Sequence, residues 1–148
     1  MTRLGRPARV LLVEDDAADA QLMRIAFAEA HPDALLSVAT DGEDALRALT
    51  RPSPGEEPPD LVLLDLNLPR LTGHELLAAV RESDVAEAQR TPVVVLSTSG
   101  ARTDVARSYE LGARSHIVKP HGIDELLATV ETLARYWFDT VELPADGE

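Results

Sequence analysis

The chain has 148 residues, about the size of one domain, and its formal net charge is −12. Nucleic-acid binding depends on Lys and Arg side chains that neutralise phosphates, so this charge argues against a nucleic-acid ligand. The chain has no cysteine, which excludes disulfides and thiolate metal sites. No stretch reaches the length of a membrane span, and the basic arm at residues 1–8 lacks the apolar segment of a signal peptide. We therefore expect a cytoplasmic protein with an aliphatic core, without membrane contact.

Strand and helix signals alternate along the chain. After the arm at 1–8, the patterns predict strand 9–13, helix 17–30, strand 35–39, helix 42–49, strand 61–65, helix 72–83, strand 93–97, helix 101–111, strand 115–118 and helix 123–135. Asp41 is a suitable N-cap, Thr72 and Glu75 fit a capping box, and Gly112 suits the left-handed residue that ends a helix. Uninterrupted apolar strands are typical of parallel sheets covered on both faces. The fold class is therefore α/β, a parallel sheet in one domain at 9–135.

Polar residues follow four of the five predicted strands. Glu14 and Asp15 follow the first strand, Asp65 ends the third, Ser97 ends the fourth and Lys119 follows the fifth. In an open parallel sheet, ligands bind outside the carboxyl ends of the strands. We therefore expect these side chains to share one site.

A carboxylate at the end of a buried strand can act as a nucleophile, and Asp65 is placed to form an acyl phosphate. A divalent cation relieves the repulsion between two anionic groups, and Mg²⁺ (or Mn²⁺) suits ligands of this kind. Glu14 and Asp15 are the candidate ligands beside Asp65, with the backbone carbonyl of Asn67 as a further oxygen. Without metal, crowding of these acids should raise some of their pKa values.

Two further side chains complete the predicted chemistry. Lys119 would bring a fixed positive charge to the phosphoryl oxygens, and Ser97 would donate its hydroxyl to one of them. Taken singly, each residue has an ordinary interpretation: a helix-capping acid, a loop hydroxyl or a solvated lysine. The complementary set at four strand ends favours a phosphoryl-transfer site.

These motifs resemble the receiver domain of two-component response regulators, over about residues 9–134. The matching segments are Val13-Glu14-Asp15-Asp16, Leu63-Leu64-Asp65-Leu66-Asn67-Leu68-Pro69, Gly73, Pro92-Val93-Val94-Val95-Leu96-Ser97, Leu111-Gly112-Ala113 and Val118-Lys119-Pro120. The resemblance implies a flavodoxin-like three-layer α/β/α fold with strand order 2-1-3-4-5. It implies phosphoryl transfer from a sensor histidine kinase to Asp65, with Ser97 as the switch hydroxyl. It also implies a cis peptide bond before Pro120.

A narrower resemblance is to phytochrome-associated response regulators, which are stand-alone receivers that dimerise. It rests on the Asp65-Leu66-Asn67-Leu68-Pro69 motif, the Pro-rich loop at 51–59 and the tail at 136–148. It implies that the kinase is a bacterial phytochrome and that the protein is a homodimer. Tyr136, Trp137 and Phe138 cannot all face one core from a helix, so this tail is the predicted dimerisation extension.

Three residues near the site carry secondary predictions. His116 stands where receivers often have Tyr or Phe, so it is either a pH-sensitive rotamer switch or a half-exposed surface histidine. Asn67 and Ser99 occupy positions that tune phosphoryl loss in the family. Neither is bulky or acidic, so water should reach an acyl phosphate.

Other functions remain open at this point. A phosphatase of the haloacid-dehalogenase type would want an acid two residues after the nucleophile, where this chain has Asn67. A flavodoxin-like flavin binder would place its phosphate against Glu14 and Asp15, which would repel it. A docking-only receiver would not need the complete set of site residues. The leading interpretation is a signalling module rather than an enzyme with an output domain. It would act on a downstream protein through residues 101–111, 115–118 and 123–135.

Overall fold

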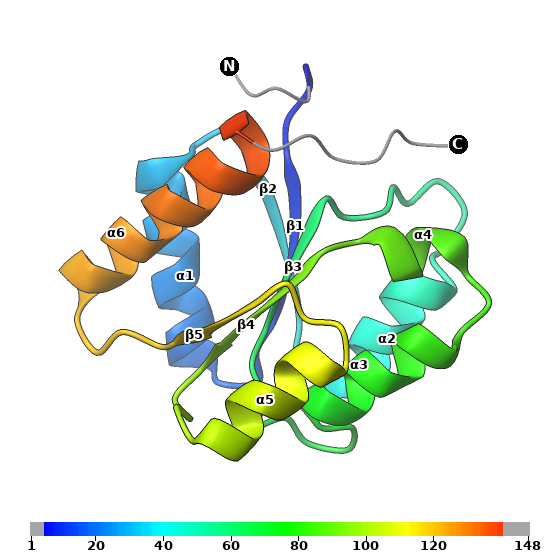
Figure 1. Cartoon of the computed structure of the whole chain (residues 1–148). Helices are drawn as coiled ribbons and strands as arrows, with labels where there is room; N and C mark the ends of the chain where they lie inside the picture. Colours follow the sequence, from blue (N-terminus) through cyan, green and yellow to red (C-terminus); the bar gives the residue numbers. More distant parts are fainter. Residues whose placement is uncertain (1–4, 141–148) are drawn as a thin grey trace.

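The computed structural model describes residues 5–140, which form a single parallel sheet wrapped by helices (Figure 1). Its five strands lie in the order β2-β1-β3-β4-β5. Their bounds are β1 Arg9–Val13, β2 Leu35–Ala39, β3 Leu61–Leu64, β4 Val93–Ser97 and β5 Ser115–Val118. This arrangement confirms the predicted fold class and strand order, and it places the carboxyl ends of β1, β3 and β4 side by side.

Helices cover both faces of the sheet (Figure 1). Their bounds are α1 Ala17–Ala30, α2 Gly42–Thr50, α3 Gly73–Glu82, α4 Ala86–Arg90, α5 Arg102–Glu110, α6 Ile123–Ala134 and a π-helical segment, η1, Arg135–Thr140. The short α4 was not predicted, because five residues are too few to show a helical period. The π-helical continuation of α6 was not predicted either, although no Gly or Pro marks a stop before it or within it.

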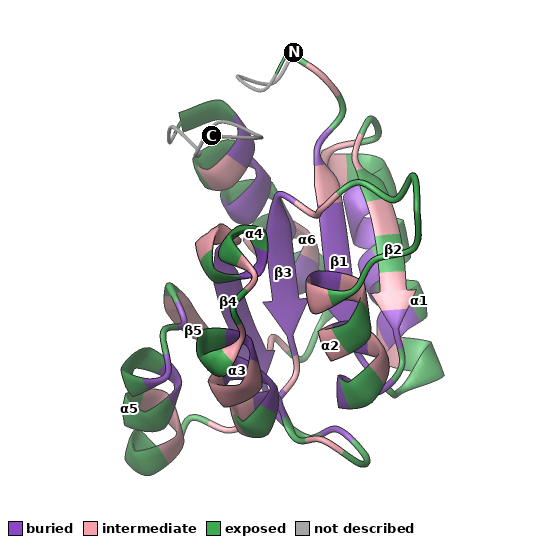
Figure 2. Ribbon diagram, turned by 90° about the vertical axis from the view of Figure 1, so that its right-hand side faces the viewer, coloured by how far each residue is buried: buried purple, intermediate pink, exposed green. Residues whose placement is uncertain are grey.

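The core is split by the sheet into two layers, because successive side chains of a strand point to opposite faces. Figure 2 shows β3 and β4 buried along their whole length. On one face, Leu11, Val62 and Val95 pack with residues of α2 and α3. On the other face, Val10 and Leu63 pack with residues of α1 and α6. The uninterrupted apolar strands are thus explained by burial on both sides.

Local signals at the helix ends are present as predicted. Asp41 caps α2 by accepting the backbone N–H of Asp44. Thr72 and Glu75 form both halves of a capping box at the start of α3. Gly112 follows α5 with a φ of +102°, a left-handed conformation that glycine adopts without strain. The caps at Asp41 and Thr72 fix where the loops after β2 and β3 end.

The Lys119–Pro120 peptide bond corrects one prediction. No peptide bond among residues 5–140 is cis, so this bond is trans. A trans X–Pro bond is favoured by about 0.5–1 kcal/mol.

The predicted chain ends are only partly described. Arg6 of the arm pairs with Asp60 through two nitrogen–oxygen contacts of 2.9 and 2.8 Å, so this part of the arm is anchored beside β1. Residues 1–4 of the arm and 141–148 of the tail lie outside the described residues. The domain bounds inferred from the sequence stay a prediction. Within residues 5–140, no helix has the length and apolar character needed to cross a membrane.

Candidate functional site

Three carboxylates meet at the carboxyl edge of the sheet. Glu14 and Asp15 follow β1, and Asp65 follows the adjacent strand β3. Each offers an oxygen that lies within 4.8 Å of the oxygens of the other two. Glu14 is buried, Asp65 is half-buried and Asp15 is exposed, so the cluster opens to solvent on one side. The structure thus gathers the acids that the sequence predicted.

The ammonium of Lys119 lies among these acids. Its Nζ atom is 2.6 Å from Glu14 Oε1 and 3.6 Å from Asp65 Oδ2. The loop that carries it is fixed by the Lys119 backbone N–H, which donates to the carbonyl oxygen of Ser97 at 2.7 Å. The lysine therefore reaches the cluster from β5, as predicted, but its closest partner is Glu14 rather than Asp65.

Asp19 is a site residue that the sequence analysis missed. Its Oδ2 atom accepts from Lys119 Nζ at 3.3 Å. Asp19 lies in the first turn of α1, where an acid has an ordinary explanation in the helix dipole. A usable signal was its place in the first turn of the helix that directly follows Glu14 and Asp15.

Burial and charge perturb two groups of the cluster. Burial raises the pKa of the Glu14 carboxyl to about 7, against the opposing hydrogen bond from Lys119 and with a further contribution from the charge of Asp65. Burial acts to lower the pKa of the Lys119 ammonium, but the hydrogen bond and charges of the surrounding carboxylates outweigh it and raise that pKa. The pKa of Glu14 is raised, as predicted, but burial is the main cause and the neighbouring acid Asp65 contributes less.

The acidic cluster fits a divalent cation. Carboxylate oxygens are the ligands that Mg²⁺ and Mn²⁺ prefer, and three of them converge here from two loops. Glu14, Asp15 and Asp65 are therefore the residues that would hold the ion.

The loop after β3 is held tightly around Asp65. The backbone N–H of Asn67 donates to Asp65 Oδ1 at 3.1 Å, and the N–H of Gly73 donates to the carbonyl of Leu66 at 3.0 Å. A Cβ atom at Gly73 would lie 2.7 Å from both the carbonyl oxygen of Asp65 and Cα of Leu66. Asn67 itself is exposed. The start of α3 thus packs directly on the backbone that positions Asp65.

Ser97 ends β4 next to β3 and is fully buried, with 0% exposure. Its hydroxyl oxygen accepts the backbone N–H of Ser99 at 3.2 Å. Ser99 is half-buried, and its own hydroxyl hydrogen bonds to the carboxylate of Asp104. The predicted switch hydroxyl is therefore tied to the loop that leads into α5.

His116 is more constrained than either sequence prediction assumed. It is partly buried on β5, and both ring nitrogens have partners. Nδ1 lies 2.9 Å from Ser108 Oγ, and Nε2 lies 2.9 Å from the carbonyl oxygen of Ser99. Whether His116 acts as a switch stays a prediction.

The aromatic tail divides between core and surface. Phe138 is fully buried, and its ring lies 5.4 Å from the ring of His31. This corrects the prediction that Phe138 lines a dimer interface, because the π-helical turn directs it into the core. Trp137 is partly buried, and Tyr136, which is 50% exposed, meets it edge to face at 5.1 Å. Tyr136 and Trp137 remain available at the surface.

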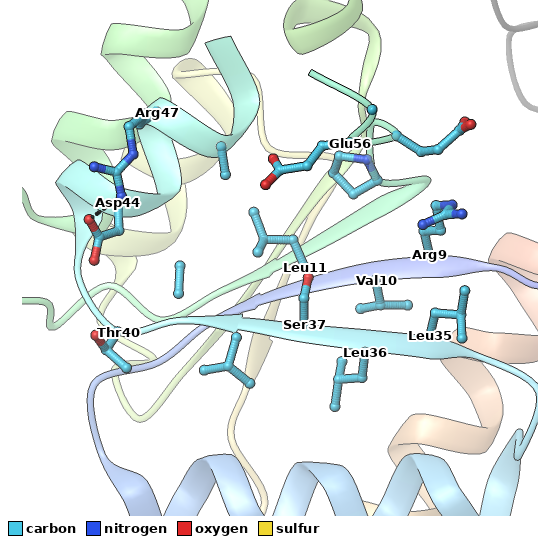
Figure 3. A pocket seen from close by; sticks show the side chains of 16 residues that line it. Arg9, Val10, Leu11, Leu35, Leu36, Ser37, Thr40, Asp44, Arg47 and Glu56 are labelled. Atoms are coloured by element: carbon cyan, nitrogen blue, oxygen red, sulfur yellow. Dashed lines mark hydrogen bonds and ion pairs between the residues drawn. The ribbon is translucent and has the colours of Figure 1, made fainter. Parts of the chain in front are cut away.

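In the described part of the chain, one cavity lies apart from this site and another borders it. One, of about 640 Å³, runs along the edge strand β2, and Arg47, Asp44 and Glu56 are among the residues that line it (Figure 3). It contains none of the acids or the lysine described above. The other, of about 180 Å³, borders Lys119 and Asp19 and includes Thr98 and His121. The convergent chemistry thus lies at the strand ends rather than in the larger cavity.

A parallel sheet of this order, with an acidic cluster and a lysine at its carboxyl edge, has the features expected of a receiver domain. The family model for the response regulator receiver domain matches residues 10–131, and the chain belongs to this family. Response regulator Rcp1 of Synechocystis sp. is 37% identical over 141 residues, which cover 94% of this chain and 95% of Rcp1.

Solved structures agree with this assignment. The phosphorylated cyanobacterial phytochrome response regulator RcpA is 34% identical, with a TM-score of 0.86, over 94% of this chain and 99% of that one. The Mn²⁺-bound form of Rcp1 is 36% identical, with a TM-score of 0.83, over 94% of this chain and 100% of that one. The likeness therefore extends beyond the family motifs to nearly the whole length of stand-alone phytochrome response regulators.

Proposed function

We propose that this response regulator accepts a phosphoryl group on Asp65 from a sensor histidine kinase, in a step that requires Mg²⁺ or Mn²⁺. The observation that carries the proposal is the convergence of Glu14, Asp15 and Asp65 within 4.8 Å, with Lys119 Nζ 3.6 Å from Asp65. The relatives add support, since Rcp1 has been solved with Mn²⁺ and RcpA in a phosphorylated form.

The chemistry is a transfer between two nucleophiles. A carboxylate oxygen of Asp65 attacks the phosphorus of a phosphohistidine, the new O–P bond forms, and the P–N bond breaks with its electron pair returning to the imidazole. A cation held by Glu14, Asp15, Asp65 and the Asn67 carbonyl would neutralise charge on the phosphoryl oxygens. Lys119 supplies a second positive charge from the end of β5 and needs only to exchange Glu14 for a phosphoryl oxygen.

Residues beside Asp65 would govern how long the phosphoryl group stays. Asn67 is exposed and Ser99 is half-buried, so neither shields the acyl phosphate fully from water. Ser97 would turn its hydroxyl toward a phosphoryl oxygen and give up the N–H of Ser99. Release of this hydrogen bond would shift the loop into α5 and bias an existing two-state equilibrium.

The output would be a change in protein contacts. Three large apolar side chains are about half exposed across α5, β5 and α6: Tyr109 at 49%, Val118 at 52% and Ile123 at 45%. Apolar groups on this face suit a downstream protein. Tyr136 and Trp137 would support a homodimer. By likeness to RcpA, the kinase partner is a phytochrome.

Phosphorylation of the purified chain tests the proposal. Incubation with acetyl phosphate and Mg²⁺ should add the mass of one phosphoryl group to the wild type. The Asp65→Asn variant should gain nothing, whereas Asp84→Asn, an exposed acid between α3 and α4, should behave as wild type. Transfer to Asp84→Asn and Asp65→Asn alike would refute Asp65 as the acceptor. An autophosphorylated phytochrome kinase, used in place of acetyl phosphate, tests the partner separately.

A further inference from the structure

The surroundings of Ser108 form a hydrogen-bonded group outside the carboxylate cluster. Ser108 lies on α5 with 0% exposure. Its Oγ atom is 2.9 Å from His116 Nδ1 on β5, 3.0 Å from His74 Nε2 on α3 and 2.9 Å from the carbonyl oxygen of Asp104 on its own helix. One buried hydroxyl thus joins α3, α5 and β5.

The hydroxyl of Ser108 has one proton and two acceptors that compete for it. The carbonyl of Ser99 can only accept, so the 2.9 Å contact requires His116 to carry a proton on Nε2. A neutral His116 then has a bare Nδ1, which accepts from Ser108. The carbonyl of Asp104 then receives no hydrogen bond from Ser108, while His74 donates from Nε2 to the Ser108 oxygen. All contacts except the one to Asp104 are satisfied in this arrangement.

In a second arrangement of the same atoms, the ring proton of His116 lies on the other nitrogen. If His116 carries its proton on Nδ1, that N–H donates to Ser108 Oγ, and the hydroxyl turns to donate to the carbonyl of Asp104. His74 still donates to Ser108, because a hydroxyl oxygen accepts two hydrogen bonds. His116 Nε2 then becomes an acceptor and cannot face the carbonyl of Ser99.

Ser99 connects these two arrangements to the phosphorylation site. Its N–H donates to Ser97 Oγ at 3.2 Å, its carbonyl accepts from His116, and its hydroxyl bonds to Asp104. When Ser97 turns to a phosphoryl oxygen, Ser99 loses the partner of its N–H and its carbonyl is free to leave His116. The Ser99 carbonyl then no longer requires the Nε2–H tautomer of His116.

We propose that Ser108 and His116 form a hydrogen-bond switch in which phosphorylation of Asp65 changes the His116 tautomer from Nε2–H to Nδ1–H. The Ser108 hydroxyl moves from His116 to the carbonyl of Asp104, and His74 is a positioning residue that holds Ser108 in both states. His74 on α3 and Asp104 on α5 contact the switch through Ser108 and Ser99, and the Tyr109 hydroxyl oxygen accepts the His116 backbone N–H at 3.2 Å. This inference rests on the proposed function of Asp65.

Long-range ¹H–¹⁵N NMR of the imidazoles tests the switch in the intact chain. The chain has four histidines, and His31, whose ring lies against Phe138, serves as the internal reference. Spectra are recorded about two pH units above the reference pKa of histidine, so that free imidazoles are neutral. Beryllofluoride with Mg²⁺ serves as a stable phosphoryl mimic, and amide shifts around Asp65 report its binding.

The expected result is an Nε2–H tautomer of His116 in the free protein and an Nδ1–H tautomer with beryllofluoride bound, with His31 unchanged. The Ser108→Ala variant should still bind beryllofluoride. Its His116 should then show a mixture of the Nε2–H and Nδ1–H tautomers instead of the Nδ1–H tautomer alone. If beryllofluoride shifts the amides around Asp65 but His116 keeps Nε2–H, the switch is wrong and the proposed function stands. If the amides around Asp65 do not shift at all, the proposed function itself fails.

Discussion

Lys119 places its ammonium 2.6 Å from the Oε1 atom of Glu14, a full ångström closer than its 3.6 Å distance to Asp65. Glu14 is 3% exposed, so this pair lies away from solvent. A buried carboxylate without a partner would be costly, and the lysine is the cation that compensates it. A metal ion or a phosphoryl group that enters the site must therefore compete with an existing ion pair.

Metal binding should depend on pH through Glu14. Burial raises the pKa of Glu14 to about 7, and a cation binds only the ionised carboxylate, so protons and metal compete below that pH. The dissociation constant for Mg²⁺ should rise about tenfold between pH 8 and pH 6. Isothermal titration calorimetry at several pH values measures it.

The Glu14→Gln variant should bind Mg²⁺ more weakly at pH 8 and lose most of this pH dependence. Glu29→Gln, an exposed acid on α1, is the matched control and should retain the wild-type slope. A constant dissociation constant for the wild type across this range would contradict the assigned role of Glu14.

Replacement of Lys119 should separate metal binding from phosphorylation. In Lys119→Met, the competitor of the metal for Glu14 is removed, so Mg²⁺ affinity should hold or increase. The initial rate of phosphorylation by acetyl phosphate should fall about 100-fold or more, because a charge aimed at the phosphoryl oxygens is gone.

Intact-mass time courses at saturating Mg²⁺ measure that rate. Arg24→Met removes an exposed cation from α1 and should leave the rate unchanged. A Lys119→Met variant that phosphorylates at the wild-type rate would remove the lysine from the proposed chemistry.

Gly73 should be required for the position of Asp65. A Cβ atom there would approach two backbone atoms at 2.7 Å, and neither can move without shifting the Asp65 loop. Gly73→Ala should lower the free energy of unfolding by about 1–3 kcal/mol and weaken Mg²⁺ binding. Urea unfolding followed by circular dichroism gives the first quantity, and calorimetry gives the second.

Gly122→Ala is the comparison for that variant. A Cβ atom at Gly122, the N-cap of α6, meets nothing within 4 Å. Its free energy of unfolding should change by about 0.5 kcal/mol or less. Equal effects of the two substitutions would show that the close approach at Gly73 is unimportant.

Features set by strand ends or by near neighbours in the chain could be predicted from the sequence, whereas contacts among side chains of several elements could not. Asp65 and Lys119 could be placed because strand ends in a parallel sheet share one edge, and apolar runs mark those ends. Local signals such as the Thr72 capping box also sufficed, because their partners lie a few residues away. The preference of Lys119 for Glu14 and the contacts of Ser108 depend on side chains from several elements. A local sequence pattern does not determine which of several nearby acceptors a side chain bonds to in the folded protein.

The sequence also did not show which aromatic residues of the tail are buried, and their positions allow one more prediction. Phe138 is fully buried against His31, whereas Tyr136 is half exposed, so one stabilises the fold and the other is available for a partner. Phe138→Ala should lower the free energy of unfolding by about 3–5 kcal/mol, as a large core truncation does. Tyr136→Ser should change it by about 0.5 kcal/mol or less.

Light scattering on a sizing column should then show a dimer for the wild type and a monomer for Tyr136→Ser, if the proposed interface is correct. Deletion of residues 136–148 would not separate the two roles, because it removes the core residue Phe138 together with the surface residue Tyr136. Tyr109→Ser, an equally exposed tyrosine on α5, distinguishes the two faces of the molecule. A dimer that survives Tyr136→Ser but not Tyr109→Ser would move the interface to α5 and β5.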